Sequence, residues 1–419
     1  MRYPKRAYTF SVDYFSTPES VDPEKCGILV THRNHAFFDI GVISENAHFG
    51  GQCMGTQFAF DWRQIIHSRK NMAVLGLFMA AFIVAFFALS WTKRLDVTQT
   101  SQATANAALA NYAEYNLDTL SKAQKPLLAN LDAQNSATGV IGLGLQLDEP
   151  DTTRNGLVSL RTAQLAMRQH HYKALNTMPL PPLHQLTGDV RSLNVLKSEG
   201  RPAATSVSTS AFYIVLVLPY LGWITGAAAI LLSCDSWIER RRHRTHTTAR
   251  PLTAGLAGSS RLLMLTGFYI LTLLAGFALM VATPALIAGL GDFNYPIAVM
   301  GTAILPLWQY ILLFGGLTIL AGIWLISFSM LVNTWITNVY LTAFIVMAAG
   351  LLPVMLPQLF HFLWFLPMPY LDSYATLSGT LVDRLNQPLA SVVIGTGLLF
   401  LWTFVNLFIF GLRVKKEAA

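Results

Sequence analysis

The chain has 419 residues, of which 53% are hydrophobic and only 12% charged, and its mean hydropathy is +0.45. Charged residues this sparse cannot cover the surface of soluble domains of that length, so the composition predicts a membrane protein. The formal net charge of +7 does not indicate nucleic-acid binding, because the basic residues lie beside apolar runs, as cytoplasmic flanks do.

Residues 1–53 contain two of the three cysteines and show no membrane-span pattern. We expect them to form a poorly structured N-terminal extension that is dispensable for membrane insertion. The codons of Gly50 and Gly51 can spell a ribosome-binding core at a suitable distance before Met54. A natural start at Met54 and a genuine cytoplasmic extension, flexible as termini often are, therefore both stay open.

A short basic segment leads directly into the first apolar run, within residues 54–91. Apolar side chains recur in it at helical spacing, and basic side chains are available to meet lipid phosphates. The pattern predicts an amphipathic elbow helix on the membrane surface, although an ordinary juxtamembrane flank would look similar. The residues that define it are Phe58, Trp62, Arg63, Arg69 and Lys70.

Uncharged runs of about 20 residues predict six transmembrane helices in an all-α, polytopic membrane protein. They cover approximately residues 72–91, 211–233, 262–288, 305–332, 339–356 and 392–412. Basic clusters before the first, between the second and third, and after the sixth fall on one side of the membrane, which predicts that both termini are cytoplasmic. Residues 211–419 would then form the second to sixth helices.

Residues 92–210 differ in composition and should form a mostly helical extracytoplasmic domain between the first two helices. An Ala-rich stretch predicts one long helix from about residue 101 to 135, continuing the first span outward. Gly139, Gly142 and Gly144 with the acidic turn at 148–151 are expected to end it. A second helix is predicted at about 157–176, and the domain should lack disulfides because it contains no cysteine.

Several kinds of chemistry have no motif in the sequence. A phosphate-binding G-x-x-x-x-G-K-[ST] loop does not occur, and neither does a zinc-binding H-E-x-x-H motif. The predicted spans contain no ionisable residue that could carry a coupling proton or sodium ion, and no nucleophile with a base. Transport would therefore have to be driven by a partner.

Two further segments carry motifs. The loop at 235–261, between the second and third spans, has acidic residues, a basic stretch and a Pro-Leu turn before an arginine; its residues are Asp235, Glu239, Arg250, Pro251, Leu252 and Arg261. The segment at 357–391, between the fifth and sixth spans, has a Pro-aromatic-Leu-Asp stretch followed by Ser-Gly; its residues are Pro367, Pro369, Tyr370, Asp372, Ser378 and Gly379. We expect Asp372 and Asp383 to be solvated.

Together with the basic segment at 58–71 and the six-span layout, these motifs resemble the permease subunit of ABC transporters of the ABC-2 exporter type. The resemblance implies a coupling helix at 235–261 that docks into a separate ATPase subunit, and short helices at 357–391 that re-enter the outer leaflet. It also implies a bacterial cytoplasmic membrane protein that pairs with a second permease copy or a paralogue. The chain itself would hold no cofactor and would not be an enzyme, because ATP is bound by the partner.

The resulting hypothesis is an ATP-driven exporter of an amphipathic, peptide- or lipid-like cargo. A membrane-anchored sensor or immunity protein, whose outer domain binds a peptide, is the alternative from another class. A membrane enzyme ranks third, because the spans offer no nucleophile. Cargo, direction and the choice between a homodimer and a heterodimer are left open by the sequence.

Overall fold

The structure is a computed structural model that describes residues 49–115, 122, 124–172, 180–238, 254–356 and 361–418. The chain divides into two compact units, residues 1–60 and 61–419. Helix α1 (Phe49–His67) begins in the first unit, within the segment predicted to be poorly structured, and residues 1–48 lie outside the described residues. The elements named next belong to the second unit.

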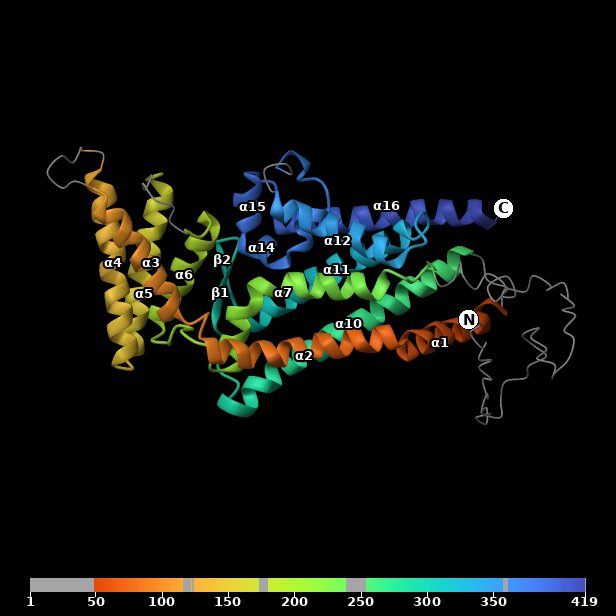
Figure 1. Cartoon of the computed structure of the whole chain (residues 1–419), viewed down its shortest axis with the longest axis horizontal. Helices are drawn as coiled ribbons and strands as arrows, with labels where there is room; N and C mark the ends of the chain where they lie inside the picture. Colours follow the sequence, from red (N-terminus) through yellow and green to blue (C-terminus); the bar gives the residue numbers. More distant parts are fainter. Residues whose placement is uncertain are drawn as a thin grey trace, which may run out of the picture. The chain divides into compact units, whose positions relative to one another are not determined.

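Among the described residues, five helices are long and apolar enough to cross a membrane (Figure 1). They are α2 (Arg69–Thr92), α7 (Ser210–Ser233), α10 (Ala254–Ala288), α11 (Leu307–Val332) and α16 (Val392–Ala418). Each coincides with a predicted span. The prediction of a mostly helical, multi-pass membrane protein is confirmed at this level.

Helix α12 (Val339–Met355) lies where the fifth span is predicted, but it has only 17 residues. Its rise is about 26 Å at 1.5 Å per residue, slightly less than the ~30 Å of the hydrocarbon layer. The count of six spans therefore stays a prediction.

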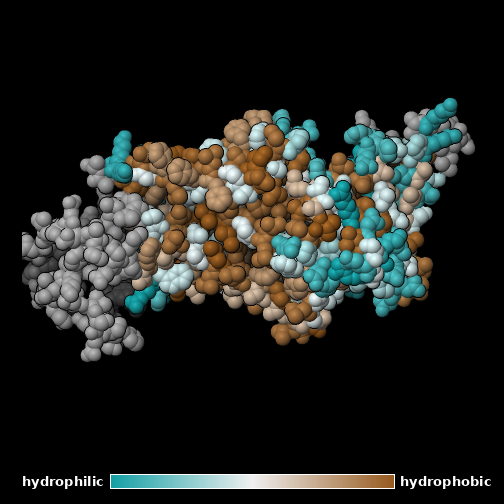
Figure 2. All heavy atoms as spheres, turned by 180° about the vertical axis from the view of Figure 1, so that it is seen from behind, coloured by the Kyte–Doolittle hydropathy of each residue, from teal (hydrophilic) through white to brown (hydrophobic). Residues whose placement is uncertain are grey.

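The outer surface of the helices is apolar. Phe344 is 69% exposed, Phe404 68% and Leu312 66%. Figure 2 shows apolar side chains over most of the helical bundle on the face in view, whereas hydrophilic side chains gather toward the right of the picture. A soluble protein seldom exposes so large a continuous apolar area, which fits a lipid environment.

Glycines let aromatic rings pack against the backbone inside this bundle. Gly322 of α11 lies under the ring of Tyr269 of α10, and a Cβ at Gly322 would be 2.6 Å from Tyr269 Cζ. Gly276 of α10 similarly accommodates Phe82 of α2, at 2.8 Å from an added Cβ. Small residues at helix contacts are typical of membrane proteins, because close packing replaces the hydrophobic effect there.

Residues 92–210 form a helical domain with α3 (Val97–Ala113), α4 (Lys125–Gln146), α5 (Pro150–Gln169) and α6 (Leu183–Ser198). The prediction of one long helix from about residue 101 to 135 is wrong, because α3 ends at Ala113 and α4 begins at Lys125. Two further expectations about this helix are also wrong. It does not continue the first span, because Lys93 ends α2 in a left-handed conformation with φ 51°, and α4 runs through the three glycines. Gly144 instead touches Thr153, where a Cβ would lie 2.6 Å from the Thr153 N, so α5 packs closely on α4.

A short antiparallel hairpin corrects the all-α prediction. Strand β1 (Pro296–Val299) pairs with β2 (Ala303–Pro306), with Pro296 opposite Pro306 and Val299 opposite Ala303. Met300 and Gly301 form the turn with φ values of 53° and 66°. The hairpin stands between α10 and α11, and the end of the bundle where it lies is called the hairpin end (Figure 1).

Short helices follow α12 on the way to α16. They are η3 (His361–Leu363), η4 (Met368–Leu371), α14 (Ser373–Ser378) and α15 (Thr380–Leu385). The Met300 N–H donates a hydrogen bond to the Leu377 carbonyl at 2.7 Å, which holds α14 at the hairpin end.

Candidate functional site

Helix α1 meets the membrane helices through a polar contact that its sequence pattern does not reveal. Asp61 is only 5% exposed, and its Oδ2 accepts a hydrogen bond of 2.7 Å from Ser260 Oγ near the start of α10. One turn further, Gln64 Oε1 accepts a 3.1 Å hydrogen bond from Arg261 Nη1. The buried face of α1 therefore carries a carboxylate as well as apolar side chains.

The break between α1 and α2 lies at Ser68, which has extended backbone angles. Just after it, Lys70 forms an ion pair with Asp235, the second residue after α7, and also donates to the Leu232 carbonyl at 3.4 Å. Both side chains are under a third exposed, at 31% and 24%. Partial burial strengthens such a pair over one at a free surface.

These contacts form one group, the polar junction, made of Asp61, Gln64, Lys70, Asp235, Ser260 and Arg261. Two of its members, Asp235 and Arg261, were predicted as the ends of the coupling loop, and Lys70 as an elbow residue. The structure thus brings the predicted elbow and both ends of the predicted coupling loop into direct contact. Glu239, Arg250, Pro251 and Leu252 lie outside the described residues.

The aromatic ring of Phe410, near the end of α16, joins the same two loop ends. Trp237 packs edge-on against Phe410 with ring centroids 4.8 Å apart. Gly258 lies against the same ring, where a Cβ would be 2.6 Å from Phe410 Cε1. The two ends of the loop are therefore held close together, at the end of the bundle where Arg413 stacks on Trp335 at 5.6 Å.

The other residues predicted for the elbow partly follow the pattern of an amphipathic helix, with an aromatic side chain on the bundle and basic side chains in solvent. Trp62 packs edge-on against Phe268 of α10, with centroids 6.2 Å apart, while Arg63 and Arg69 are exposed. Phe58 belongs to the first unit and is partly exposed.

The residues predicted to form short re-entrant helices lie in η4, α14 and their junctions. Pro367 precedes η4, which contains Pro369 and Tyr370; Ser378 ends α14, and Gly379 follows in a left-handed conformation with φ 83°. Gly379 is needed there because an added Cβ would lie 2.9 Å from the Cβ of His184.

The expectation that Asp372 is solvated is wrong. Its side chain is 9% exposed, and Oδ1 caps α14 by accepting a 3.0 Å hydrogen bond from the Ala375 N–H. Arg384 lies 3.7 Å from Oδ2, at the edge of an ion pair. Asp383 is also largely buried, at 19% exposure, because it pairs with His184.

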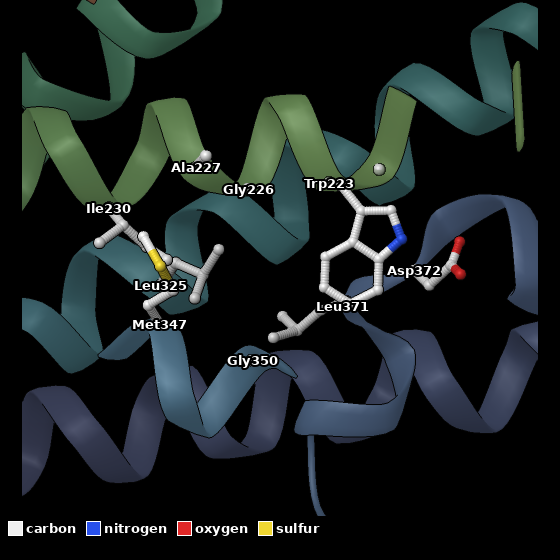
Figure 3. A pocket seen from close by; sticks show the side chains of 10 residues that line it. Trp223, Gly226, Ala227, Ile230, Leu325, Met347, Gly350, Leu371 and Asp372 are labelled. Carbon is white, nitrogen blue, oxygen red and sulfur yellow. The ribbon is translucent and has the colours of Figure 1, made fainter. Parts of the chain in front are cut away.

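Asp372 and Leu371 border a cavity of about 250 Å³ among α7, α11, α12 and η4 (Figure 3). Figure 3 shows Ile230, Leu325 and Met347 at one end of the cavity and Trp223 at the other, with Asp372 beyond the indole ring. Apolar pockets with a few polar groups are the usual sites for small ligands. No sequence motif marked this cavity; the G-x-x-x-G spacing of Gly222 and Gly226 was its available signal.

Helix α6 attaches the helical domain to the hairpin end. The Asp383 Oδ2 accepts a 2.8 Å hydrogen bond from the His184 N–H, and its Oδ1 lies 2.6 Å from His184 Nδ1. Arg191 Nη1 donates to the Thr302 carbonyl in the hairpin turn at 2.6 Å. The domain therefore rests on α15 and on the hairpin turn.

Arg201, just after α6, adds a second attachment. Its Nη1 donates to Asp292 Oδ2 at 2.5 Å and to the Asn294 carbonyl at 3.2 Å. Burial alone would raise the pKa of Asp292, but hydrogen bonds from the Asn294 N–H and from Arg201 lower it. Nearby, burial raises the pKa of Tyr295 to about 12.

Comparisons with known proteins do not assign a family. No family model matches the chain, and searches of curated proteins and of solved structures found no match. Within the part of the chain that the structure describes, no group of three or more His, Cys, Asp or Glu side chains could hold a metal ion.

Proposed function

We propose that this chain is the transmembrane permease subunit of an ATP-driven exporter of the ABC-2 type, working with a separate ATPase subunit. One observation carries the proposal: the polar junction joins α1 and the start of α2 to the two ends of the loop at 235–261. Helix α1 contacts Ser260 and Arg261 at one end, and Lys70 of α2 contacts Asp235 at the other. A force applied by an ATPase to that loop would reach α1, α2, α7 and α10 together. The basic residues around this end favour a cytoplasmic location for it.

The six-span layout belongs to the same proposal. Asn333, directly after α11, donates a 3.4 Å hydrogen bond to the Ser233 carbonyl at the end of α7, so α11 ends away from the hairpin. Helix α12 starts beside that end, and the η4 and α14 segments that follow lie at the hairpin end. With α12 as the fifth of six crossings, α1 and the end of α16 share one side, the cytoplasmic side of a bacterial membrane.

The sensor or immunity alternative is less well supported. A sensing domain held by an anchor needs few contacts with the spans, whereas α6 is joined to α15 and to the hairpin turn by His184 and Arg191. The helical domain is thus built into the outer part of the bundle. In the exporter it would lie outside the cell and support the exit of an amphipathic cargo between two permease copies or paralogues.

The direct test is association with an ATPase. The full chain, co-expressed with an ATPase subunit encoded beside it, should co-purify with that subunit and regulate its ATP hydrolysis in nanodiscs. Replacing Arg250, Pro251 and Leu252 together by alanine should abolish both the co-purification and the regulation of ATP hydrolysis. The variant should still be inserted in the membrane. A matched control replaces Lys415 and Lys416, which are basic but lie outside the loop. No associated ATPase activity, or equal effects of both replacements, would contradict the proposal.

A charge swap tests the junction itself. Lys70→Asp should weaken the regulation of ATP hydrolysis, because it places two carboxylates together beside α7. The double variant Lys70→Asp with Asp235→Lys restores an opposite pair and should recover regulation. If the double variant behaves like the single one, the ion pair has no part in coupling.

A further inference from the structure

The cavity beside α7 owes its space to missing side chains. Gly222 and Gly226 are one helical turn apart on α7, and Gly350 faces them from α12. A Cβ at Gly226 would meet Leu325 Cδ1 at 3.8 Å, and one at Gly350 would meet Leu371 Cδ1 at 3.6 Å, both ordinary contacts. Alanine would therefore fit at Gly226 and at Gly350, and glycine at these positions leaves the space between the helices open.

The two ends of the cavity differ in chemistry. Ile230, Leu325 and Met347 make one end apolar (Figure 3). At the other end lie Trp223, which is 37% exposed, and Asp372. Among the described residues that line the cavity, Asp372 is the charged one. Aromatic rings recur in sites that bind organic cations, and a carboxylate supplies the opposite charge.

The carboxylate of Asp372 retains capacity for a ligand. It accepts backbone hydrogen bonds from Ala375 and Tyr374, whereas a carboxylate offers about four acceptor positions, so about two stay open. The Arg384 nitrogen is 3.7 Å away, beyond hydrogen-bond distance, and its side chain is 41% exposed, so solvent screens much of its charge. A negative charge so little exposed is stabilised by a further cation at close range.

We infer that this cavity binds an amphipathic cation, a short apolar chain or ring bearing an amine or quaternary ammonium group. The apolar part occupies the end formed by Ile230, Leu325 and Met347, and the cationic group lies at the end with Trp223 and Asp372. The volume of about 250 Å³ is below the ~300–1,000 Å³ of typical ligand pockets. The bound portion is therefore one short chain, and a folded peptide is excluded. That this cation is the cargo rests on the proposed exporter function.

The test uses the purified full chain in phosphatidylcholine nanodiscs, with empty nanodiscs to subtract partitioning into lipid. Octyltrimethylammonium and octanesulfonate are titrated calorimetrically, because they share a chain and differ in the sign of the charge. We expect the cation to bind at least ten-fold more tightly than the anion. Equal affinities would overturn the inference.

Asp372→Asn is the decisive variant, since asparagine also caps helices and so preserves the start of α14. It should lower the affinity for octyltrimethylammonium at least ten-fold. Asp383→Asn is the matched control: it removes a carboxylate from the same segment outside the cavity and should leave binding unchanged. Unaltered binding by Asp372→Asn would overturn the inference and leave that residue as a helix cap alone.

Gly226→Leu provides a second test if Asp372→Asn does not fold, because it fills the cavity without touching the carboxylate. It should abolish binding of the cation; retained binding would place the ligand elsewhere and overturn the inference. None of these titrations needs an ATPase. Cation binding that depends on Asp372 in a chain that regulates no ATPase would refute the exporter function alone, and ATPase regulation without cation preference would refute the cavity assignment alone.

Discussion

Gly322→Ala is expected to destabilise the bundle through one defined contact. The added methyl group would lie 2.6 Å from Tyr269 Cζ, well inside the ~3.5–4.0 Å of a normal carbon contact. The ring cannot easily move aside, because Tyr269 is only 1% exposed and its hydroxyl lies 3.4 Å from the Thr318 carbonyl. Helices α10 and α11 would have to separate.

The magnitude follows from two opposing effects. Overpacking of a buried site costs about 1–3 kcal/mol, whereas alanine favours a helix over glycine by about 1 kcal/mol. Gly316→Ala supplies the matched control on the same helix, because nothing lies within 4 Å of its added Cβ. The helix effect cancels between the two variants, so Gly322→Ala should be less stable than Gly316→Ala by about 1–3 kcal/mol.

Equilibrium unfolding of the full chain in mixed micelles measures this difference. Tyr269→Leu removes the ring, and in that background the Gly322→Ala substitution should cost little. The double-mutant cycle should therefore show a coupling energy similar to the overpacking cost. Equal stability of the two alanine variants, or additivity with Tyr269→Leu, would refute the contact between α10 and α11.

Three other predictions concern the two ends of the bundle. A cysteine at the exposed position Ser259 should react with an impermeant thiol reagent in inverted vesicles and not in intact cells; labelling of intact cells would reverse the proposed topology. Asp292→Asn should weaken the attachment made by Arg201, measured as faster hydrogen exchange in the hairpin. Since the pKa of Asp292 is lowered, its contribution to stability is complete above its ordinary pKa of 3.8 and is lost as the pH falls through the lowered pKa. The exchange rates of the wild type and of Asp292→Asn should therefore converge in acid. His184→Ala should increase exchange in α15 by removing a partner of Asp383, whereas unchanged exchange there would show that the pair does not fix the domain.

Much of the membrane region could be predicted from sequence because hydrocarbon thickness imposes a length on each span. The runs at 211–233 and 392–412 match α7 and α16 closely for that reason. The glycines at 139, 142 and 144 misled the prediction because glycine has two uses. It interrupts isolated helices, yet Gly144 in α4 admits the backbone of α5, and this tertiary contact outweighs the local preference.

The pairings at the candidate sites could not be predicted from one sequence. Asp61 and Ser260 are 199 positions apart, and so are His184 and Asp383. The local sequence around Asp61 or Asp383 is no different from that around a solvated aspartate. Each becomes a buried contact only because a residue far away in the chain packs against it. The hairpin was missed because its strands have four residues each and lie in an uncharged stretch beside a span.

Helix α7 links the polar junction to the cavity. It carries Gly222 and Gly226 on the cavity wall, and Asp235 follows its last turn. A helix resists bending far more than a loop does, so a displacement of the Lys70–Asp235 pair would shift or rotate the whole of α7 against α11 and α12. Because the glycines leave few interlocking side chains on that wall, such movement meets less steric resistance there than at Gly322, where the Tyr269 ring fixes α10 on α11. The bundle thus combines tightly packed contacts, such as the one at Gly322, with an open contact at the cavity, and the open contact is the wall that the proposed ATPase-driven force would move.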